Sequence, residues 1–233
     1  MQGLKVVYED NHLIGVYKPP GFLVHGDATE DKPLSDYVKE YIKIRYNKPG
    51  DVFLGVIHRI DRPVSGVVLF ARTSKGLTRM NELFKKREIK KTYLAITRER
   101  PEPIEGKLEH LIAKDTSRNL AKIYETMSNR AKAQGAKKSI LEYELIGEVE
   151  GHYLIKVNPI TGRPHQIRVQ LSSLGTPILG DIKYGFKKPN RDGSIHLHCY
   201  SMEFIHPVKK EPVKVTTEPP RNQFWRIFQS HYS

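Results

Sequence analysis

The chain is poor in cysteine, in acidic side chains and in long apolar runs. Cys199 is its single cysteine among 233 residues, so no disulfide can form within the chain. No apolar stretch reaches transmembrane length, and the first residues lack the apolar core and small-residue cleavage site of a secretory signal. These deficits disfavour secreted and membrane-spanning proteins, and they predict a cytoplasmic protein in which Cys199 is a buried structural thiol.

The shortage of acids leaves a strongly basic protein. Its 26 Asp and Glu residues face 39 Lys and Arg residues, which gives a formal net charge of +13 and an isoelectric point near 9.7. Such an excess attracts phosphate backbones through the release of counterions. A nucleic acid is therefore a more probable partner than a membrane surface, since no helix with an unusually wide apolar face is apparent.

The apolar pattern predicts an α+β protein with a mixed, largely antiparallel sheet. Short apolar or alternating runs are typical of strands, and they are joined mostly by hairpins and short loops. No internal repeat or low-complexity linker interrupts the chain, so we expect a single catalytic domain over residues 1–233. The expected strands lie at 6–8, 13–17, 52–57, 67–70, 92–96 and 195–205, with a hairpin over 140–157 that turns near Glu150 and Gly151. The expected helices lie at 34–42, 74–87, 164–174 and 224–228.

One polar segment has two interpretations. Residues 114–138 carry seven basic side chains against two acidic ones and show little periodicity. Charge runs usually face water, so a solvated surface excursion is as good an interpretation as an arm that contacts RNA.

A first motif places one carboxylate among basic side chains. In HRIDRPVSG, residues 58–66, Asp61 has Arg59 two positions before it and Arg62 directly after it, in the loop between two apolar strands. Alternation in an extended segment puts Arg59 and Asp61 on one side. Asp61 either caps the turn for stability, or it is an ionised catalytic group held by arginines.

A second motif favours the catalytic interpretation. In GRPHQIR, residues 162–168, Arg163 and Arg168 stand at the start of a predicted helix, where the free N–H groups repel cations. Something negative must offset that repulsion. A phosphate and the Asp61 carboxylate are the obvious candidates, because the guanidinium fork of Arg binds both.

These motifs, with KPPG at 18–21, KKTYLAI at 90–96 and LGTPILGDIKYG at 174–185, resemble the RluA family of RNA pseudouridine synthases over the whole chain. The resemblance implies the pseudouridine synthase fold with a basic cleft, and isomerisation of specific uridines in ribosomal or transfer RNA without a metal or an organic cofactor. It implies that Asp61 is the essential carboxylate and that Arg168 is its salt-bridge partner. It also implies that Arg59 helps to extrude the target nucleotide and that Tyr93 stacks on the uracil.

The chain departs from the family pattern at two positions. Val64 stands where Thr is frequent, and Gln170 stands where His is common. Neither position is among the residues given chemical roles, so the departures bear on substrate choice and not on the reaction. The seventeen residues before Lys18 leave no room for the S4 domain of many relatives, so we expect a short member. Nothing in the sequence demands more than a monomer.

Other enzyme and binding classes remain open from the sequence. A nucleoside or RNA glycosidase usually needs a second acid, and Asp181 resembles a structural turn of the family more than a catalytic group. His196 and His198 lack the partners of a metal site, so we expect core or surface histidines. A noncatalytic RNA-binding protein that uses the same basic cleft is the alternative function. The sequence does not choose between attack of Asp61 on C1′ and removal of the 2′ proton.

Overall fold

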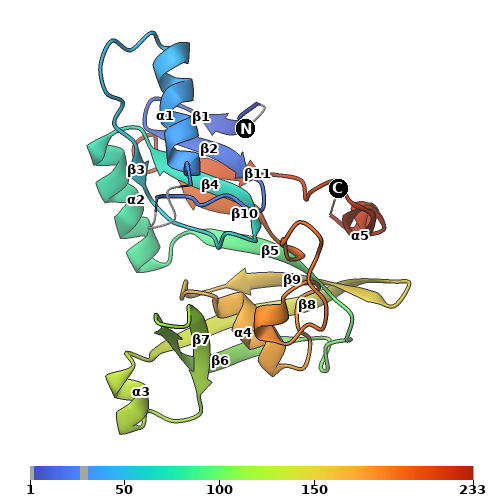
Figure 1. Ribbon diagram of the computed structural model, residues 1–233. Coiled ribbons are helices and arrows are strands. Elements are labelled where there is room, and N and C mark those ends of the chain that lie inside the picture. Colours follow the sequence, from blue (N-terminus) through green and yellow to red (C-terminus); the bar gives the residue numbers. More distant parts are fainter. Residues whose placement is uncertain (1–2, 27–30, 233) are drawn as a thin grey trace. The chain divides into compact units, whose positions relative to one another are not determined.

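The computed structural model describes residues 3–26 and 31–232, which fold as two compact units (Figure 1). Unit 1 comprises Met1–Lys90 and Cys199–Pro219, and unit 2 comprises Lys91–His198 and Pro220–Ser233. Within the described residues, no helix is both long enough and apolar enough to cross a membrane. The expectation of one domain over residues 1–233 stays a prediction.

Unit 1 is built on strands in the order β1-β2-β4-β10, with β3 paired to β4 and β11 paired to β10. β1 with β2, β2 with β4, β3 with β4 and β10 with β11 are all antiparallel pairs. All seven residues of β4 are buried, as its continuous apolar run predicts. The strands are β1 (Val6–Glu9), β2 (Leu13–Lys18), β3 (Gly55–Val56), β4 (Ser65–Ala71), β10 (Leu197–Ile205) and β11 (Pro212–Thr216).

In the described part of unit 1, two helices accompany these strands. α1 (Leu34–Arg45) buries Leu34, Val38 and Ile42, which recur every four residues along one face. α2 (Ser74–Lys86) begins at the residue where the sequence predicts it, and the Thr73 side chain caps it by accepting a hydrogen bond from the Gly76 amide.

Unit 2 contains strands in the order β5-β9-β8-β6-β7, each antiparallel to its neighbour. The β8–β9 hairpin turns at Glu150 and Gly151, both with positive φ, as predicted. The predicted α+β class is confirmed by this arrangement of strands and helices. The strands are β5 (Lys90–Thr97), β6 (Glu105–Asp115), β7 (Leu120–Tyr124), β8 (Lys137–Val149) and β9 (His152–Pro159).

The polar segment 114–138, here called the basic arm, is folded. It contains the end of β6, β7, the short helix α3 (Asn129–Ala133) and the start of β8, which lie at one end of unit 2 in Figure 1. Ala131 and Ala136 of the arm form a small core with the adjacent Ala113, and Leu111 and Tyr124 pack against them. Alanines leave little apolar signal in a sequence, so the pattern did not reveal these elements.

The remaining elements of unit 2 follow β9. α4 (Gln166–Ser173) is followed by the short 3-10 helix η1 (Ile182–Tyr184), and the chain ends with α5 (Gln223–Arg226) and η2 (Gln229–His231). The closing helix is shorter than predicted, but Trp225 is buried as part of it, and its ring lies 5.8 Å from the ring of His196 and 6.0 Å from that of His198. Both histidines therefore belong to the core.

Candidate active site

The register of unit 1 brings two of the sequence motifs together. β2 and β4 pair with Lys18 opposite Gly66, so the KPPG turn after β2 lies beside the Asp61 loop that precedes β4. Gly66 has a φ of +131°, and a Cβ added there would lie 2.3 Å from the carbonyl oxygen of Cys199. Only glycine fits this close approach of strands, which explains why the motif ends in Gly66.

Hydrogen bonds fasten the Asp61 loop to the KPPG turn. The carbonyl oxygen of Arg62 accepts from the Gly21 amide at 2.8 Å and from Lys18 Nζ at 3.1 Å. Arg62 Nε donates back to the Gly21 carbonyl at 3.0 Å, and the Val64 amide donates to the Asp61 carbonyl at 3.0 Å. The backbone that follows Asp61 is thus fixed by a neighbouring strand end and by its own turn.

Lys18 is a fully buried cation at the centre of these contacts. Its ammonium group donates to the carbonyl oxygens of Pro19 (3.1 Å), Phe22 (2.9 Å) and Arg62 (3.1 Å). A charged lysine has three N–H donors, and the three carbonyl oxygens therefore match all of them. Burial lowers the pKa of Lys18 to about 7, the nearby Asp61 carboxylate opposes that shift, and Arg62 adds to it.

The two motif residues of unit 1 that were predicted to act on RNA share this loop. Asp61 is half-buried and Arg59 is exposed, whereas Ile60 between them is buried and anchors the loop. Arg62 is directed elsewhere, because its guanidinium group lies 2.7 Å from the Asp31 carboxylate. The loop also starts from a fixed point, since His58 Nε2 accepts a hydrogen bond from the Leu69 amide at 3.0 Å.

The other two predicted residues lie in unit 2. Tyr93 is half-buried on β5, opposite Val157 on β9. Arg168 is in the first turn of α4 and is buried. Arg168 Nε donates to Asp181 Oδ2 at 2.7 Å and its Nη2 donates to Asp181 Oδ1 at 2.8 Å, so the pair is a bidentate fork.

Asp181 is the residue that sequence reasoning undervalued. It is 1% exposed, and its carboxylate offsets the charge of Arg168 at the start of α4. The sequence indicated that this charge needed a negative partner, but it named only a phosphate and Asp61. The Leu179–Gly185 turn that contains Asp181 is thirteen residues further along the chain from Arg168, and no local pattern links the two.

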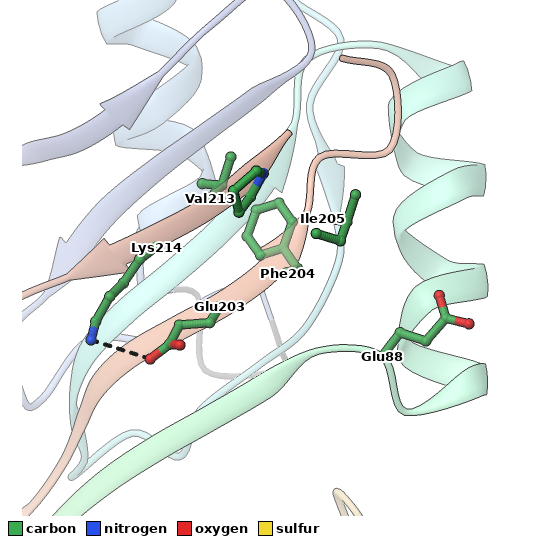
Figure 2. A pocket seen from close by; sticks show the side chains of 7 residues that line it. Glu88, Glu203, Phe204, Ile205, Val213 and Lys214 are labelled. Carbon is green, nitrogen blue, oxygen red and sulfur yellow. Dashed lines mark ion pairs between the residues drawn. The ribbon is translucent and has the colours of Figure 1, made fainter. Parts of the chain in front are cut away.

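A shallow open pocket of about 410 Å³ lies elsewhere in unit 1, between the end of α2 and the β10–β11 hairpin (Figure 2). Its apolar lining consists of Phe204, Ile205, Pro212 and Val213, and among its polar lining residues Glu203 forms an ion pair of 3.3 Å with Lys214. Glu88 adds a second carboxylate. None of the predicted site residues lines this pocket, and its acidic groups do not favour phosphate.

Comparison with known proteins connects these residues to one family. Residues 12–173 match the family described as RNA pseudouridylate synthase. A tRNA pseudouridine synthase C of Haemophilus influenzae is 34% identical over 231 residues, which cover 91% of this chain and 92% of that protein. A ribosomal large subunit pseudouridine synthase C of Buchnera aphidicola is 30% identical over 224 residues; the match covers 91% of this chain but only 65% of that longer relative.

Solved structures agree with the fold. The human RNA pseudouridylate synthase domain containing 4 protein superposes with a TM-score of 0.78 at 24% identity, and the match covers 98% of this chain and 92% of that chain. The human domain containing 1 protein gives a TM-score of 0.71 at 23% identity, with 96% and 86% coverage. The predicted pseudouridine synthase fold is thereby confirmed.

Proposed function

We infer that this chain, which belongs to the RNA pseudouridylate synthase family, isomerises uridine in structured ribosomal or transfer RNA with Asp61 as its essential carboxylate. The observation that carries the assignment of Asp61 is its loop. It holds the one acid of the HRIDRPVSG motif, and its backbone is fastened by Lys18 and Gly21. A half-buried carboxylate on a fixed loop is suited to a role that demands accurate placement.

The reaction rearranges bonds within one nucleotide. The glycosidic bond between N1 and C1′ breaks, the uracil turns, and C5 bonds to C1′ while the C5 proton is lost and N1 becomes protonated. Asp61 assists either by attacking C1′, which makes a covalent intermediate, or by removing the 2′ proton, and both routes remain open. Neither route calls for a second carboxylate or for a net change in atoms.

We propose roles for the other predicted residues from the family pattern. Arg59 is exposed beside Asp61 and enters the space that the flipped nucleotide leaves, which offsets part of the few kcal/mol that unstacking costs. Tyr93 stacks on the uracil and retains it while it turns. Arg168 pairs with the Asp61 carboxylate in the catalytic state, with Asp181 as the group that holds its guanidinium in place.

The RNA class is proposed from charge and from the relatives. A net charge of +13 favours a polyanionic substrate, and the relatives named above act on transfer RNA and on the large ribosomal subunit. The basic arm presents exposed lysines, including Lys132, Lys137 and Lys138, on an ordered support. We propose that these lysines contact the RNA backbone.

The test is release of tritium from RNA whose uridines are labelled at C5. The wild-type protein should release the label and leave pseudouridine in the RNA, whereas Asp61→Asn should bind RNA with unchanged affinity and release none. Free uracil in solution would replace this proposal with a glycosidase. Equal tritium release by Asp61→Asn would remove Asp61 from the chemistry.

A noncatalytic RNA-binding role is the second candidate, and the charge balance is the observation that favours it. Cells that depend on the protein distinguish the two functions. If Asp61→Asn restores every phenotype of a deletion strain, binding alone is the function; failure of Asp61→Asn to restore the phenotype, together with normal RNA binding, supports catalysis.

A further inference from the structure

Tyr184 joins three parts of unit 2 through a single side chain. It lies in η1, in the same turn as Asp181, and it is 6% exposed. Its hydroxyl oxygen accepts a hydrogen bond from the Ala121 amide of β7 at 2.7 Å, and it also lies 2.7 Å from Nδ1 of His165. The backbone amide can only donate, whereas the imidazole tautomer sets which atom donates in the bond between Tyr184 and His165.

The ring of Tyr184 contacts the guanidinium group of Arg168, which lies in the helix that follows His165. The guanidinium carbon of Arg168 lies 4.9 Å from the ring centroid, within cation–π range. The guanidinium group of Arg168 therefore contacts both the ring of Tyr184 and the carboxylate of Asp181. Both groups come from one short turn, so the turn forms a cradle for the guanidinium.

His165 also helps to position Arg168, because its backbone begins the helix that contains Arg168. It is the N-cap of α4 and has a φ of +54°, a conformation that costs energy in a non-glycine residue and persists only when its surroundings fix it. Its bond to Tyr184 is one of those fixing contacts, and its ring packs edge-on against the Tyr184 ring at 5.7 Å. Because Arg168 lies one turn into α4, the position of His165 sets the position of Arg168.

Packing ties this cradle to the base of the basic arm. Ile112, Ala121, Val169 and Tyr184 form one buried cluster, with Leu120 and Ile123 against it. The cluster therefore contains residues of β6, β7, α4 and η1, and Tyr184 is its polar link.

We propose that Tyr184 is a positioning residue that acts on the reaction through Arg168; this rests on the proposed function. The Tyr184 hydroxyl fixes the start of α4 and the β7 edge, and its ring fixes the guanidinium group. Loss of the hydroxyl alone should lower turnover more than it lowers RNA binding, because the protein surface that meets RNA keeps its charges.

The experiment compares two matched variants. Tyr184→Phe removes a buried hydroxyl that meets His165 and Ala121, whereas Tyr143→Phe removes a buried hydroxyl that donates to the Pro103 carbonyl at 3.0 Å. Tyr143 is 4% exposed, so each of the two substitutions removes one buried hydroxyl group from the same unit. We expect Tyr184→Phe to lower kcat for tritium release about tenfold, and Tyr143→Phe to lower it less than about twofold, with Kd for RNA within about twofold of wild type in both.

A second variant keeps the proposal falsifiable should Tyr184→Phe fold poorly. His165→Asn places a residue that tolerates positive φ at the same N-cap and removes the imidazole that Tyr184 contacts. It should lower kcat about as much as Tyr184→Phe. Nitrogen NMR of the wild-type imidazoles should also show a signal of His165 Nδ1 that moves in Tyr184→Phe, because the hydrogen bond to the hydroxyl group is then lost.

The outcomes separate the two levels of inference. An inactive wild-type protein would overturn the proposed function and this inference with it. If the wild type is active and Tyr184→Phe and His165→Asn match Tyr143→Phe in kcat, Tyr184 is a structural residue only. A loss confined to RNA affinity would also contradict the proposal.

Discussion

Among the described residues, each unit contains a buried cation in its part of the candidate site, Lys18 in unit 1 and Arg168 in unit 2, and the two cations are stabilised differently. In unit 1, Lys18 donates to three backbone carbonyl groups next to the Asp61 loop. In unit 2, Arg168 forks onto the Asp181 carboxylate. Dipoles surround the first cation, and a full negative charge meets the second.

The difference matters because the two groups respond differently to their surroundings. A lysine surrounded by carbonyls can lose its proton, and burial lowers the pKa of Lys18 to about 7. An arginine keeps its charge at any physiological pH. In unit 1 the loop is thus held by the hydrogen bonds of a titratable group, Lys18, here called the clamp. In unit 2 the ion pair with Asp181 holds a guanidinium group, Arg168, whose charge is permanent.

The largest expected effect is on the permanent pair. Asp181→Leu leaves Arg168 buried beside an apolar side chain, and we expect it to lower the free energy of unfolding by about 3–5 kcal/mol in urea denaturation. Arg168→Met should be comparably harmful. The double variant should recover a large part of the loss, because neither charge is then left alone; a double variant as unstable as the sum of the singles would contradict a direct pair.

Next in size is the clamp of unit 1. Lys18→Met keeps the aliphatic stem but leaves three carbonyl oxygens without their donor, and we expect a loss of about 2–3 kcal/mol in the free energy of unfolding. Tritium release should fall further than this loss of stability explains, because the Asp61 loop is loosened. Lys39→Met, at an exposed position of α1, is the control, and it should change neither quantity. Equal activity of the two folded variants would exclude Lys18 from placing the loop.

The pH dependence of stability sharpens the comparison. The folded pKa of Lys18 is near 7 and that of an unfolded lysine is near 10.5, so between these values the unfolded chain binds more protons. The contribution of Lys18 to the free energy of unfolding therefore rises with pH, by about 2 kcal/mol between pH 7 and pH 9. The difference in stability between wild type and Lys18→Met should show this slope. A pH-independent difference would mean that Lys18 keeps its ordinary pKa.

The smallest effect concerns cations that are not buried. Replacing Lys132, Lys137 and Lys138 of the basic arm by Ala should leave stability nearly unchanged but weaken RNA binding about tenfold at low salt, with a shallower salt dependence. Lys39, Lys43 and Lys48 of unit 1, all exposed, provide a triple variant of equal charge change as control. Equal losses in both triple variants would favour bulk charge over an arm contact, and no loss in either would favour the solvated surface.

The sequence predicted features that local pattern determines. Apolar runs located β2 and β4, and the Glu150–Gly151 turn was visible as a break between two strands. The predicted strand at 52–57 is only Gly55–Val56, because apolar composition alone does not create a pairing partner. The clamp by Lys18 depends on the register of β2 against β4, which no single segment reveals.

The candidate site shows the same limit. Asp61, Arg59, Tyr93 and Arg168 were identified because they lie in motifs, and their roles stay predictions. Asp181 and Tyr184 reach Arg168 only after α4 and the following turn have folded together. Side chains that support a site through tertiary contacts are therefore harder to find in a sequence than the motif residues they hold.

The most direct measurement of the central claim is a map of pseudouridine in total RNA from cells that lack this protein and from the same cells supplied with wild type or with Asp61→Asn. Wild type should restore one or a few uridine positions to pseudouridine, and Asp61→Asn should restore none although it is present at the same level. Restoration of the same positions by Asp61→Asn, or no change at any position with the wild type, would contradict a uridine isomerase that works through Asp61.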